Sequence, residues 1–437
     1  MTGIFLPKIS EYDPVTSAEG ALDPLGLYSI ADRLAIRLVP GIRERMQHPR
    51  FLTAMAVGSL FTKLYDEDSI ANDGITEPYL VYEWHMVEGS VRTRGDDPNL
   101  KGFPGTLKTK RCLFSDKMNL NASRYLKTAS VFGFHGVYRL LADNLDIIKK
   151  GYLGERGYEL LTVWEKEQGL NGFINGISEP GAHWYEKIKA AIDVAMKKGI
   201  VSRSGSWEGW HFFGKYLFPN EIPDNEGSLI KDIFFSDKES SRCQVLKFLT
   251  SKKGVNAWET TNSEKEFHEA LSSFVDNNTR LLLEAIKLYE LFSRLLQDAF
   301  DDCLAAMTNK RAKISSNELA ETKGCQAACH KIPILFPEVA DLLENFHQST
   351  GFHDSFASLS QSLSPSSWTI ALLQHHIKVQ RQKAPHGKNP WFERFDDGAY
   401  IIRPAYKRTE GGRHDDTYVH FYRTNPLWSF AKDLRMV

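Results

Sequence analysis

The chain has 437 residues and carries 54 Lys and Arg against 55 Asp and Glu, a formal net charge of −1. Hydrophobic residues make up 42% and charged residues 25%. These values are typical of a globular protein and exclude a disordered acidic or basic chain. The sequence has no run of about 18 apolar residues and no signal-peptide pattern at its N-terminus. We therefore expect a cytoplasmic protein with no membrane partner.

The first half of the chain predicts helices separated by loops. Residues 22–66 contain two apolar helical segments, divided by Pro40 and Gly41. Residues 78–89 suit either a short helix or a strand. Residues 90–108 are rich in Gly, Pro and Asp and predict an exposed loop. Residues 183–199 predict an amphipathic helix that ends at a glycine.

The second half contains the longest helical pattern, at residues 279–307, where apolar side chains recur every three or four positions. This stripe fits either a domain core or a seam for a partner helix. We expect residues 337–350 to pack beside it. Ser364 and Pro365 are typical of a helix start and predict a helix over 366–383.

The C-terminal part predicts further β-structure, in addition to a short strand at Tyr152-Leu153. Residues 399–406 and 417–422 resemble two strands around a polar loop that contains Gly411 and Gly412. The fold class is therefore mainly α and multi-domain, with a small β-hairpin near the C-terminus. We place the domain boundaries at the ends of four successive ranges: 1–110, 111–200, 201–355 and 356–437.

Basic residues are concentrated in two segments despite the neutral total. Residues 101–156 hold eleven Lys and Arg against four acids, and residues 371–437 hold twelve against seven. Residues 221–300 are acidic, with fourteen acids against ten bases. A phosphate backbone responds to the local field within about 8 Å at physiological salt. A near-neutral total therefore does not exclude a polyanionic partner.

Residues 115–168 carry the most informative motif. A short helix is predicted over 120–130 and a second one over 137–151. The second is followed by Gly151-Tyr152-Leu153, and the next helix opens with Gly157-Tyr158-Glu159-Leu160-Leu161. This order resembles the winged-helix element of bacterial transcription regulators. Almost no residues remain between Leu153 and Gly157, so the hairpin wing is reduced to a tight turn or is missing.

The resemblance implies contacts with DNA, which we expect more than RNA. A recognition helix presents basic and amide side chains to bases, while flanking cations bind phosphates. The expected base contacts are Arg139 and Asn144, and the expected phosphate contacts are Arg124, Lys127, Lys149 and Lys150. The alternative is a helical hairpin in which Arg139 pairs with Asp143 on a solvated face.

The second basic segment combines cations with aromatic side chains, a composition suited to unpaired bases and phosphates. The candidate nucleic-acid-binding residues here are Lys378, Arg381, Lys388, Arg403 and Arg413. The alternative is that Trp391, Tyr400, Phe421 and Trp428 pack this segment onto the helical body.

The number and spacing of the cysteines predict no disulfide framework, and we assign no metal site. Five cysteines are an odd number, as expected in a reducing compartment. Cys325, Cys329 and His330 lie close together, with Cys303 as the nearest further thiol. Structural zinc usually takes four ligands in two close pairs, so packed thiols are favoured, and zinc stays the alternative. We predict no cofactor.

The sequence contains no complete catalytic motif, and we predict a DNA-associated, non-catalytic component of a larger protein assembly with other subunits. In its general sequence character, the chain is similar to bacterial proteins encoded beside helicases or nucleases in mobile-element and phage-defence gene clusters. One alternative is a metal-dependent nuclease that uses His376, Asp396 and His420. The other is a protein-binding scaffold that uses the 279–307 helix.

Overall fold

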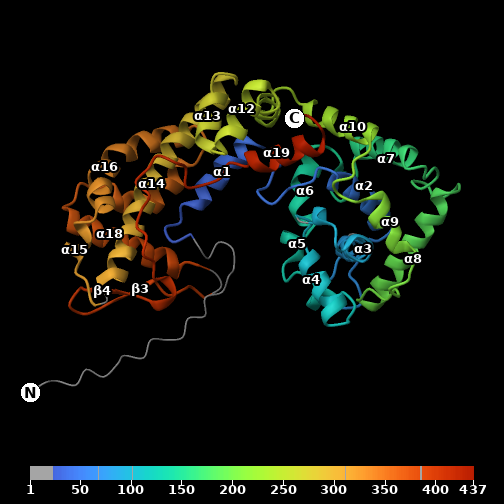
Figure 1. The fold of residues 1–437 in the computed structure, drawn as a ribbon, viewed down its shortest axis with the longest axis horizontal. Helices are drawn as coiled ribbons and strands as arrows, with labels where there is room; N and C mark the ends of the chain where they lie inside the picture. Colours follow the sequence, from blue (N-terminus) through green and yellow to red (C-terminus); the bar gives the residue numbers. More distant parts are fainter. Residues whose placement is uncertain (1–22, 67, 101, 311, 384–385) are drawn as a thin grey trace, which may run out of the picture. The chain divides into compact units, whose positions relative to one another are not determined.

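The computed structural model describes residues 23–66, 68–100, 102–310, 312–383 and 386–437. In these ranges the chain is mainly α-helical, with two short antiparallel hairpins (Figure 1). The prediction of a mainly α fold is confirmed. Residues 1–22, where we looked for a signal-peptide pattern, and Lys101 of the first basic segment lie outside the described residues.

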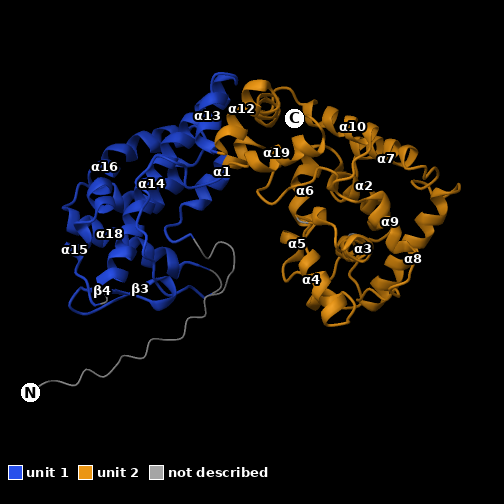
Figure 2. Cartoon of the chain, in the orientation of Figure 1, with its two compact units in different colours: residues 1–34, 263–421 blue, residues 35–262, 422–437 orange. Residues whose placement is uncertain are grey.

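The chain forms two compact units. Unit 1 comprises residues 1–34 and 263–421, and unit 2 comprises residues 35–262 and 422–437 (Figure 2). Helix α1 (Tyr28–Leu38) contains the point at which the chain first passes from one unit to the other. The four successive ranges expected as domains stay a prediction.

Unit 2 is built from helices and one very short hairpin. Its elements are α2 (Phe51–Thr62), α3 (Pro78–Arg94), α4 (Thr106–Lys110), α5 (Ala129–Phe132), α6 (Phe134–Asn144), β1 (Ile148–Lys149), β2 (Tyr152–Leu153), α7 (Glu155–Glu167), α8 (Gly181–Lys198), α9 (Gly209–Tyr216), α10 (Asp224–Phe235), α11 (Ser241–Leu249), α12 (Lys252–Thr261) and α19 (Thr424–Asp433). Single turns of 3-10 helix lie at Pro98–Leu100 and Ala122–Arg124, and a π-helical turn lies at Arg111–Ser115.

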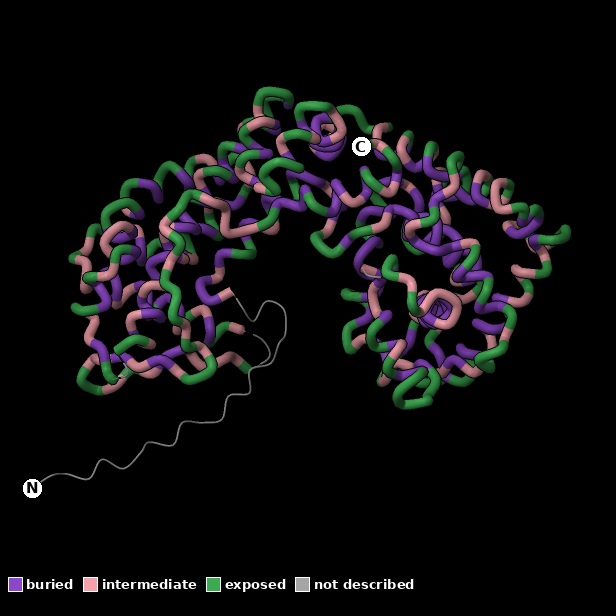
Figure 3. Tube along the Cα trace, viewed as in Figure 1, coloured by how far each residue is buried: buried purple, intermediate pink, exposed green. Residues whose placement is uncertain are grey.

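Helix α3 runs through the core of unit 2 and is buried on every side over residues 81–91 (Figure 3). Two glycines allow its close packing. A Cβ on Gly58 of α2 would lie 2.7 Å from the Tyr82 ring, and a Cβ on Gly89 would lie 2.7 Å from Phe213 of α9. The choice between helix and strand at 78–89 is thus settled as helix. The loop predicted from residue 90 is wrong up to Arg94, because the helix continues that far inside the core.

Unit 1 is also helical. Its elements are α13 (Glu264–Leu271), α14 (Asn277–Lys310), α15 (Ser316–Ala320), α16 (Lys323–Glu344), α17 (Ser349–Phe356), α18 (Pro365–Arg381), β3 (Phe392–Arg394) and β4 (Tyr400–Ile402), with 3-10 turns at Ala357–Leu359 and Pro404–Tyr406. The long helix predicted at 279–307 is confirmed as α14. Its apolar stripe lies in the core of unit 1, against α16.

The expected partner of that stripe is part of a longer helix. Residues 337–344 form the last turns of α16, which continues through Pro333 and Pro337. The predicted start of α18 is confirmed, since the Ser364 side chain accepts a hydrogen bond from the Ser367 N–H (3.3 Å) and Pro365 follows as the first helical residue. These caps are local in sequence, which is why they were predictable.

The C-terminal hairpin exists but joins different strands from those expected. Strand β4 pairs with β3, in the register Phe392↔Ile402 and Arg394↔Tyr400. Residues 417–422 form no strand. The backbone N–H groups of Val419 and His420 instead donate to the Glu290 carboxylate of α14, so this segment is held by side chains rather than by a sheet.

Candidate nucleic-acid interface

A basic groove of about 800 Å³ lies in unit 1 between the end of α18 and the β3–β4 hairpin. Its lining is polar and cationic, with two apolar side chains and one proline. The lining residues are Gln374, Ile377, Lys378, Arg381, Gln382, Pro390, Phe392, Glu393, Arg394 and Arg403.

One face of α18 forms the first wall. Residues 374, 377, 378, 381 and 382 are separated by three or four positions and therefore share a face of the helix. Lys378 and Arg381 stand in the last turn and are exposed. Cations at a helix C-terminus are favoured by the helix dipole, so the fold stabilises positive charge at this place.

Two buried histidines fix the opposite face of α18. The His375 Nε2–H donates to the Leu25 carbonyl (2.8 Å), and the His376 Nδ1–H donates to the Pro24 carbonyl (2.8 Å). The His376 Nε2 accepts from the Trp391 N–H (3.1 Å) and must therefore be unprotonated. Burial lowers the pKa of His376 to about 3. His376 thus positions the chain that enters β3.

The hairpin forms the second wall. Arg394 is the last residue of β3, and Arg403 directly follows β4, where its N–H donates to the Trp391 carbonyl (3.0 Å). The Arg403 Nε is buried and has no hydrogen-bond partner among the described residues. A buried guanidinium nitrogen without an acceptor is costly, and an anion in the groove would supply one.

The groove therefore has a surplus of positive charge. Four cations line it, Lys378, Arg381, Arg394 and Arg403, against the single acid Glu393. None of the four lies within ion-pair distance of a carboxylate in the described ranges. Some other cations of unit 1 are paired, among them Lys313 with Asp397 (3.2 Å) and Arg408 with Asp301. Clustered, unpaired cations beside a concave surface attract anions.

The structure brings together three of the five predicted C-terminal residues and adds a fourth. Lys378, Arg381 and Arg403 line the groove, whereas Lys388 and Arg413 do not. The Arg413 N–H is bound by Asp298 of α14 (3.0 Å). The sequence analysis did not predict Arg394 as a binding residue. Its position before the Asp-Asp-Gly turn at 396–398 could have indicated that it lies at the end of a strand.

Aromatic side chains near the groove are packed rather than presented to ligand. The ring of Trp391 stacks on that of Tyr406, with centroids 4.7 Å apart and planes 5° apart. Tyr400 is buried, and Trp428 is buried in unit 2. The packing alternative thus holds for these rings. Phe421 differs, since it is 70% exposed.

A second candidate surface lies on α6 and the β1–β2 hairpin of unit 2. The hairpin pairs Ile148 with Leu153 and Lys149 with Tyr152. Lys150 and Gly151 form its turn with φ of 51° and 84°, the left-handed pair typical of a tight two-residue hairpin. The predicted strand at 152–153 and the helix after it are confirmed. The hairpin lies before the expected place of the wing, because it spans 148–153 and α7 begins at Glu155. The resemblance to a winged-helix element stays a prediction.

The helical pattern before this hairpin differs from the prediction. Only a 3-10 turn and the four-residue α5 form over 120–132, and α6 ends at Asn144 rather than at residue 151. On α6, Val137 and Leu141 are buried whereas Leu140 is 36% exposed. The helix stops there because Leu145–Ile147 turn the chain into β1.

Most of the six predicted residues on this surface are exposed. Arg139 and Asn144 lie on the exposed face of α6, and Arg139 forms no ion pair with Asp143 among the pairs of the described residues. The Lys149 Nζ lies 3.7 Å from the Asp146 Oδ1. Lys127 and Lys150 are exposed.

Arg124 is partly exposed, and its Nη1 donates to the Asn119 carbonyl (3.3 Å). None of the six side chains lines either of the two hollows described for the structure.

A buried carboxylate, which the sequence did not reveal, supports the start of α6. The Glu83 Oε2 accepts from the His135 N–H (3.0 Å), and its Oε1 accepts from the Tyr125 hydroxyl (2.7 Å). Burial raises the pKa of Glu83 to about 7. This carboxylate therefore links α3 to the helix that carries Arg139.

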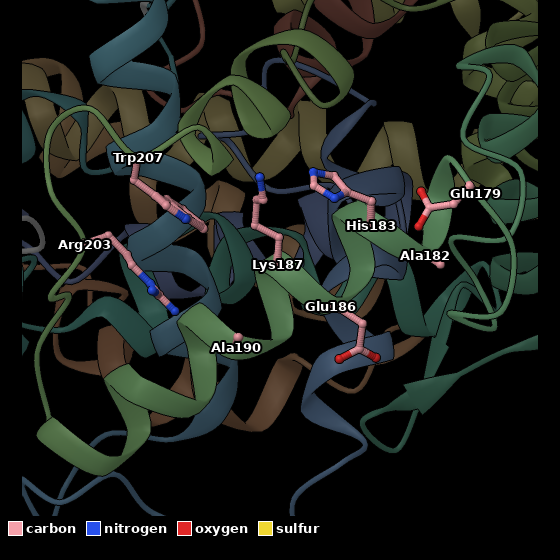
Figure 4. A pocket seen from close by; sticks show the side chains of 8 residues that line it. All are labelled: Glu179, Ala182, His183, Glu186, Lys187, Ala190, Arg203 and Trp207. Atoms are coloured by element: carbon pink, nitrogen blue, oxygen red, sulfur yellow. The ribbon is translucent and has the colours of Figure 1, made fainter.

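A second hollow of about 400 Å³ in unit 2 is balanced in charge. It is lined by Glu179, Ala182, His183, Glu186, Lys187, Ala190, Arg203 and Trp207 (Figure 4). Lys187 is paired with Glu208, and the Arg203 guanidinium lies 5.5 Å from the Trp207 ring. This balance suits a polyanion less well than the groove of unit 1.

The three residues of the nuclease alternative have separate environments. Both ring nitrogens of His376 are hydrogen-bonded to backbone, Asp396 is exposed in the β3–β4 turn, and the His420 Nδ1 lies 2.7 Å from Glu290. The described ranges contain no group of three or more His, Cys, Asp or Glu side chains arranged to hold a metal ion. Nor do they contain a helix with the length and apolarity needed to cross a membrane.

Comparison of the chain with protein-family models, curated proteins and solved structures found no match.

Proposed function

We propose that this protein binds nucleic acid, and DNA in particular, through the basic groove of unit 1. The observation that carries the proposal is the convergence of Lys378, Arg381, Arg394 and Arg403 on one groove without a paired carboxylate in the described ranges. Lys contacts phosphate as a point charge, and Arg can bind two phosphate oxygens at once.

The groove favours contact with the backbone over readout of bases. The one ring that lines the groove, Phe392, is buried, and the neighbouring Trp391 stacks on Tyr406 instead of offering an open face. Phosphate contacts position a protein on nucleic acid but carry no sequence information. We therefore expect binding that depends weakly on sequence and steeply on salt concentration.

The α6 surface of unit 2 is the proposed second contact and the reason to favour DNA. Arg139 and Asn144 lie on its exposed helical face, as base-contacting residues of a winged-helix element would. Lys149 and Lys150 stand on the adjoining hairpin, where they would meet phosphates.

The test measures the salt dependence of binding. The full-length chain is titrated onto a fluorescent 30-base-pair duplex at several salt concentrations, and binding is followed by anisotropy. The double variant Arg381→Ala, Arg394→Ala removes two exposed groove cations. The matched control Lys323→Ala, Lys331→Ala removes two exposed cations from α16 that do not line the groove.

Each phosphate contact contributes about 0.9 to the slope of log K against log salt. The groove variant should therefore lower the magnitude of the slope by about 1.8 and weaken binding about tenfold, since two exposed charge pairs together are worth about 1.4 kcal/mol. The control should bind like the wild type. Equal loss in both variants, or no binding by the wild type at low salt, would overturn the proposal.

A further inference from the structure

Two thiols face each other inside unit 1, away from the proposed interface. The Sγ atoms of Cys303 on α14 and Cys325 on α16 lie 3.4 Å apart, and both residues are fully buried. One thiol donates a hydrogen bond to the other. Two sulfur atoms at this distance need only a small movement to reach the bond length of a disulfide, about 2.05 Å.

The two helices approach closely at this level, so the movement is available. A Cβ on Gly324, the residue before Cys325, would lie 2.8 Å from the Ala299 Cα of α14. The Gly324 N–H also donates to the Asp302 side chain (2.7 Å), which joins the start of α16 to α14 beside Cys303. Disulfides need short distances between backbones, and a glycine at the crossing permits them.

The remaining thiols are placed differently. Cys112 and Cys243 belong to unit 2, and Cys329 lies one turn beyond Cys325, where its thiol donates to the Gln326 carbonyl (3.3 Å). All five thiols are free in the described structure. A selective reaction at Cys303 and Cys325 can therefore be distinguished from general oxidation.

We propose that Cys303 and Cys325 form a redox modification site, at which a peroxide converts the two thiols into a disulfide that links α14 to α16. The Cys325 sulfur attacks one peroxide oxygen, the O–O bond breaks, and water leaves after protonation. The resulting sulfenic acid is attacked by the Cys303 sulfur, which forms the S–S bond and releases a second water. Two electrons pass from the thiols to the peroxide.

The order of the two steps follows from the hydrogen bond. The hydrogen-bonded contact between the two thiols lowers the pKa of Cys325, and the same contact, together with burial, raises the pKa of Cys303. The thiolate is the form that attacks the peroxide, so Cys325 reacts first. Because both sulfurs are buried, only a small oxidant reaches them, and the reaction is slower than at an exposed thiol.

The experiment uses the native full-length chain and hydrogen peroxide. After oxidation, free thiols are blocked with iodoacetamide, and a tryptic digest is analysed by mass spectrometry without reduction. The expected product joins the peptide of residues 295–310, which holds Cys303, to the peptide of residues 324–331, with the loss of two hydrogen atoms. Dithiothreitol should restore both separate peptides.

The Cys329→Ser variant is the control, since it keeps the proposed pair and leaves Cys325 as the only thiol of its peptide. The cross-link should form equally in this variant and in the wild type. A cross-link lost on Cys329→Ser would overturn the proposal. So would oxidation of Cys325 to sulfinic acid without a cross-link, or modification of Cys112 or Cys243 before the pair. None of these outcomes depends on nucleic-acid binding.

Discussion

Replacement of Glu83 by Gln should make the stability of unit 2 less sensitive to a rise in pH from about 5 to about 8. Glu83 is fully buried in α3 and accepts hydrogen bonds from the His135 N–H and the Tyr125 hydroxyl. Gln has the same shape, and its carbonyl oxygen can keep the bond from His135. The substitution therefore removes the ionisation with little change in packing.

The magnitude follows from the pKa of the buried carboxyl. Burial raises the pKa of Glu83 from 4.5 to about 7, so the folded state holds a proton that the unfolded state releases between these values. The contribution of this group to stability is greatest at low pH and is lost as pH rises from about 4.5 to about 7. At about 1.4 kcal/mol per unit, the full loss is about 3 kcal/mol, of which about 2.5 kcal/mol falls between pH 5 and pH 8.

Urea unfolding followed by circular dichroism at pH 5, 6, 7 and 8 measures the effect. The free energy of unfolding of Glu83→Gln minus that of the wild type should rise by about 2.5 kcal/mol from pH 5 to pH 8 and then level off. Buried His85 and His135 titrate in both proteins and cancel in this difference. A difference that stays flat or falls with pH would refute the reasoning, since the two hydrogen bonds would then outweigh the desolvation of the carboxylate.

Three further predictions concern other sites. Glu226→Ala should lower the free energy of unfolding by about 3–5 kcal/mol in urea denaturation, because it leaves the buried Arg50 guanidinium without its 3.0 Å carboxylate partner. Reversal of charge at Lys149 and Lys150 should weaken binding to duplex DNA and reduce the salt slope by about 1.8 with unchanged circular dichroism; unaltered binding would exclude the hairpin as a contact. Gly324→Val should destabilise the protein by about 1–3 kcal/mol in the same urea assay, because the added side chain meets α14, and an unchanged midpoint would contradict the close approach of the helices.

Features that depend on neighbouring residues were predictable from the sequence. The apolar repeat of 279–307 gave a helix because α14 buries one continuous stripe, and Ser364 with Pro365 marked the start of α18 through a local cap. The short strand at Tyr152-Leu153 followed from the glycines around it. Each of these signals is contained within a few helical turns or one tight turn.

Features that depend on tertiary pairing were not predictable in the same way. Strand β4 was expected to pair with residues 417–422, but its neighbour is β3, joined through a short turn. The residue pattern of 417–422 does not indicate that the backbone N–H groups of Val419 and His420 donate to the Glu290 carboxylate. Arg394 and Lys378 are sixteen positions apart, and only the hairpin and α18 together bring them to one groove.

The charge count of residues 371–437 shows why net charge alone was a poor guide to the interface. Part of this positive charge is held by a carboxylate of α14, since Arg408 is paired with Asp301. This pair attaches the C-terminal segment to the helix and neutralises one of the cations in the count. The groove cations are distinct because they are close together and unpaired within the described ranges. The relevant quantity for a polyanion is therefore the charge that the fold leaves without a partner, not the sum along the sequence.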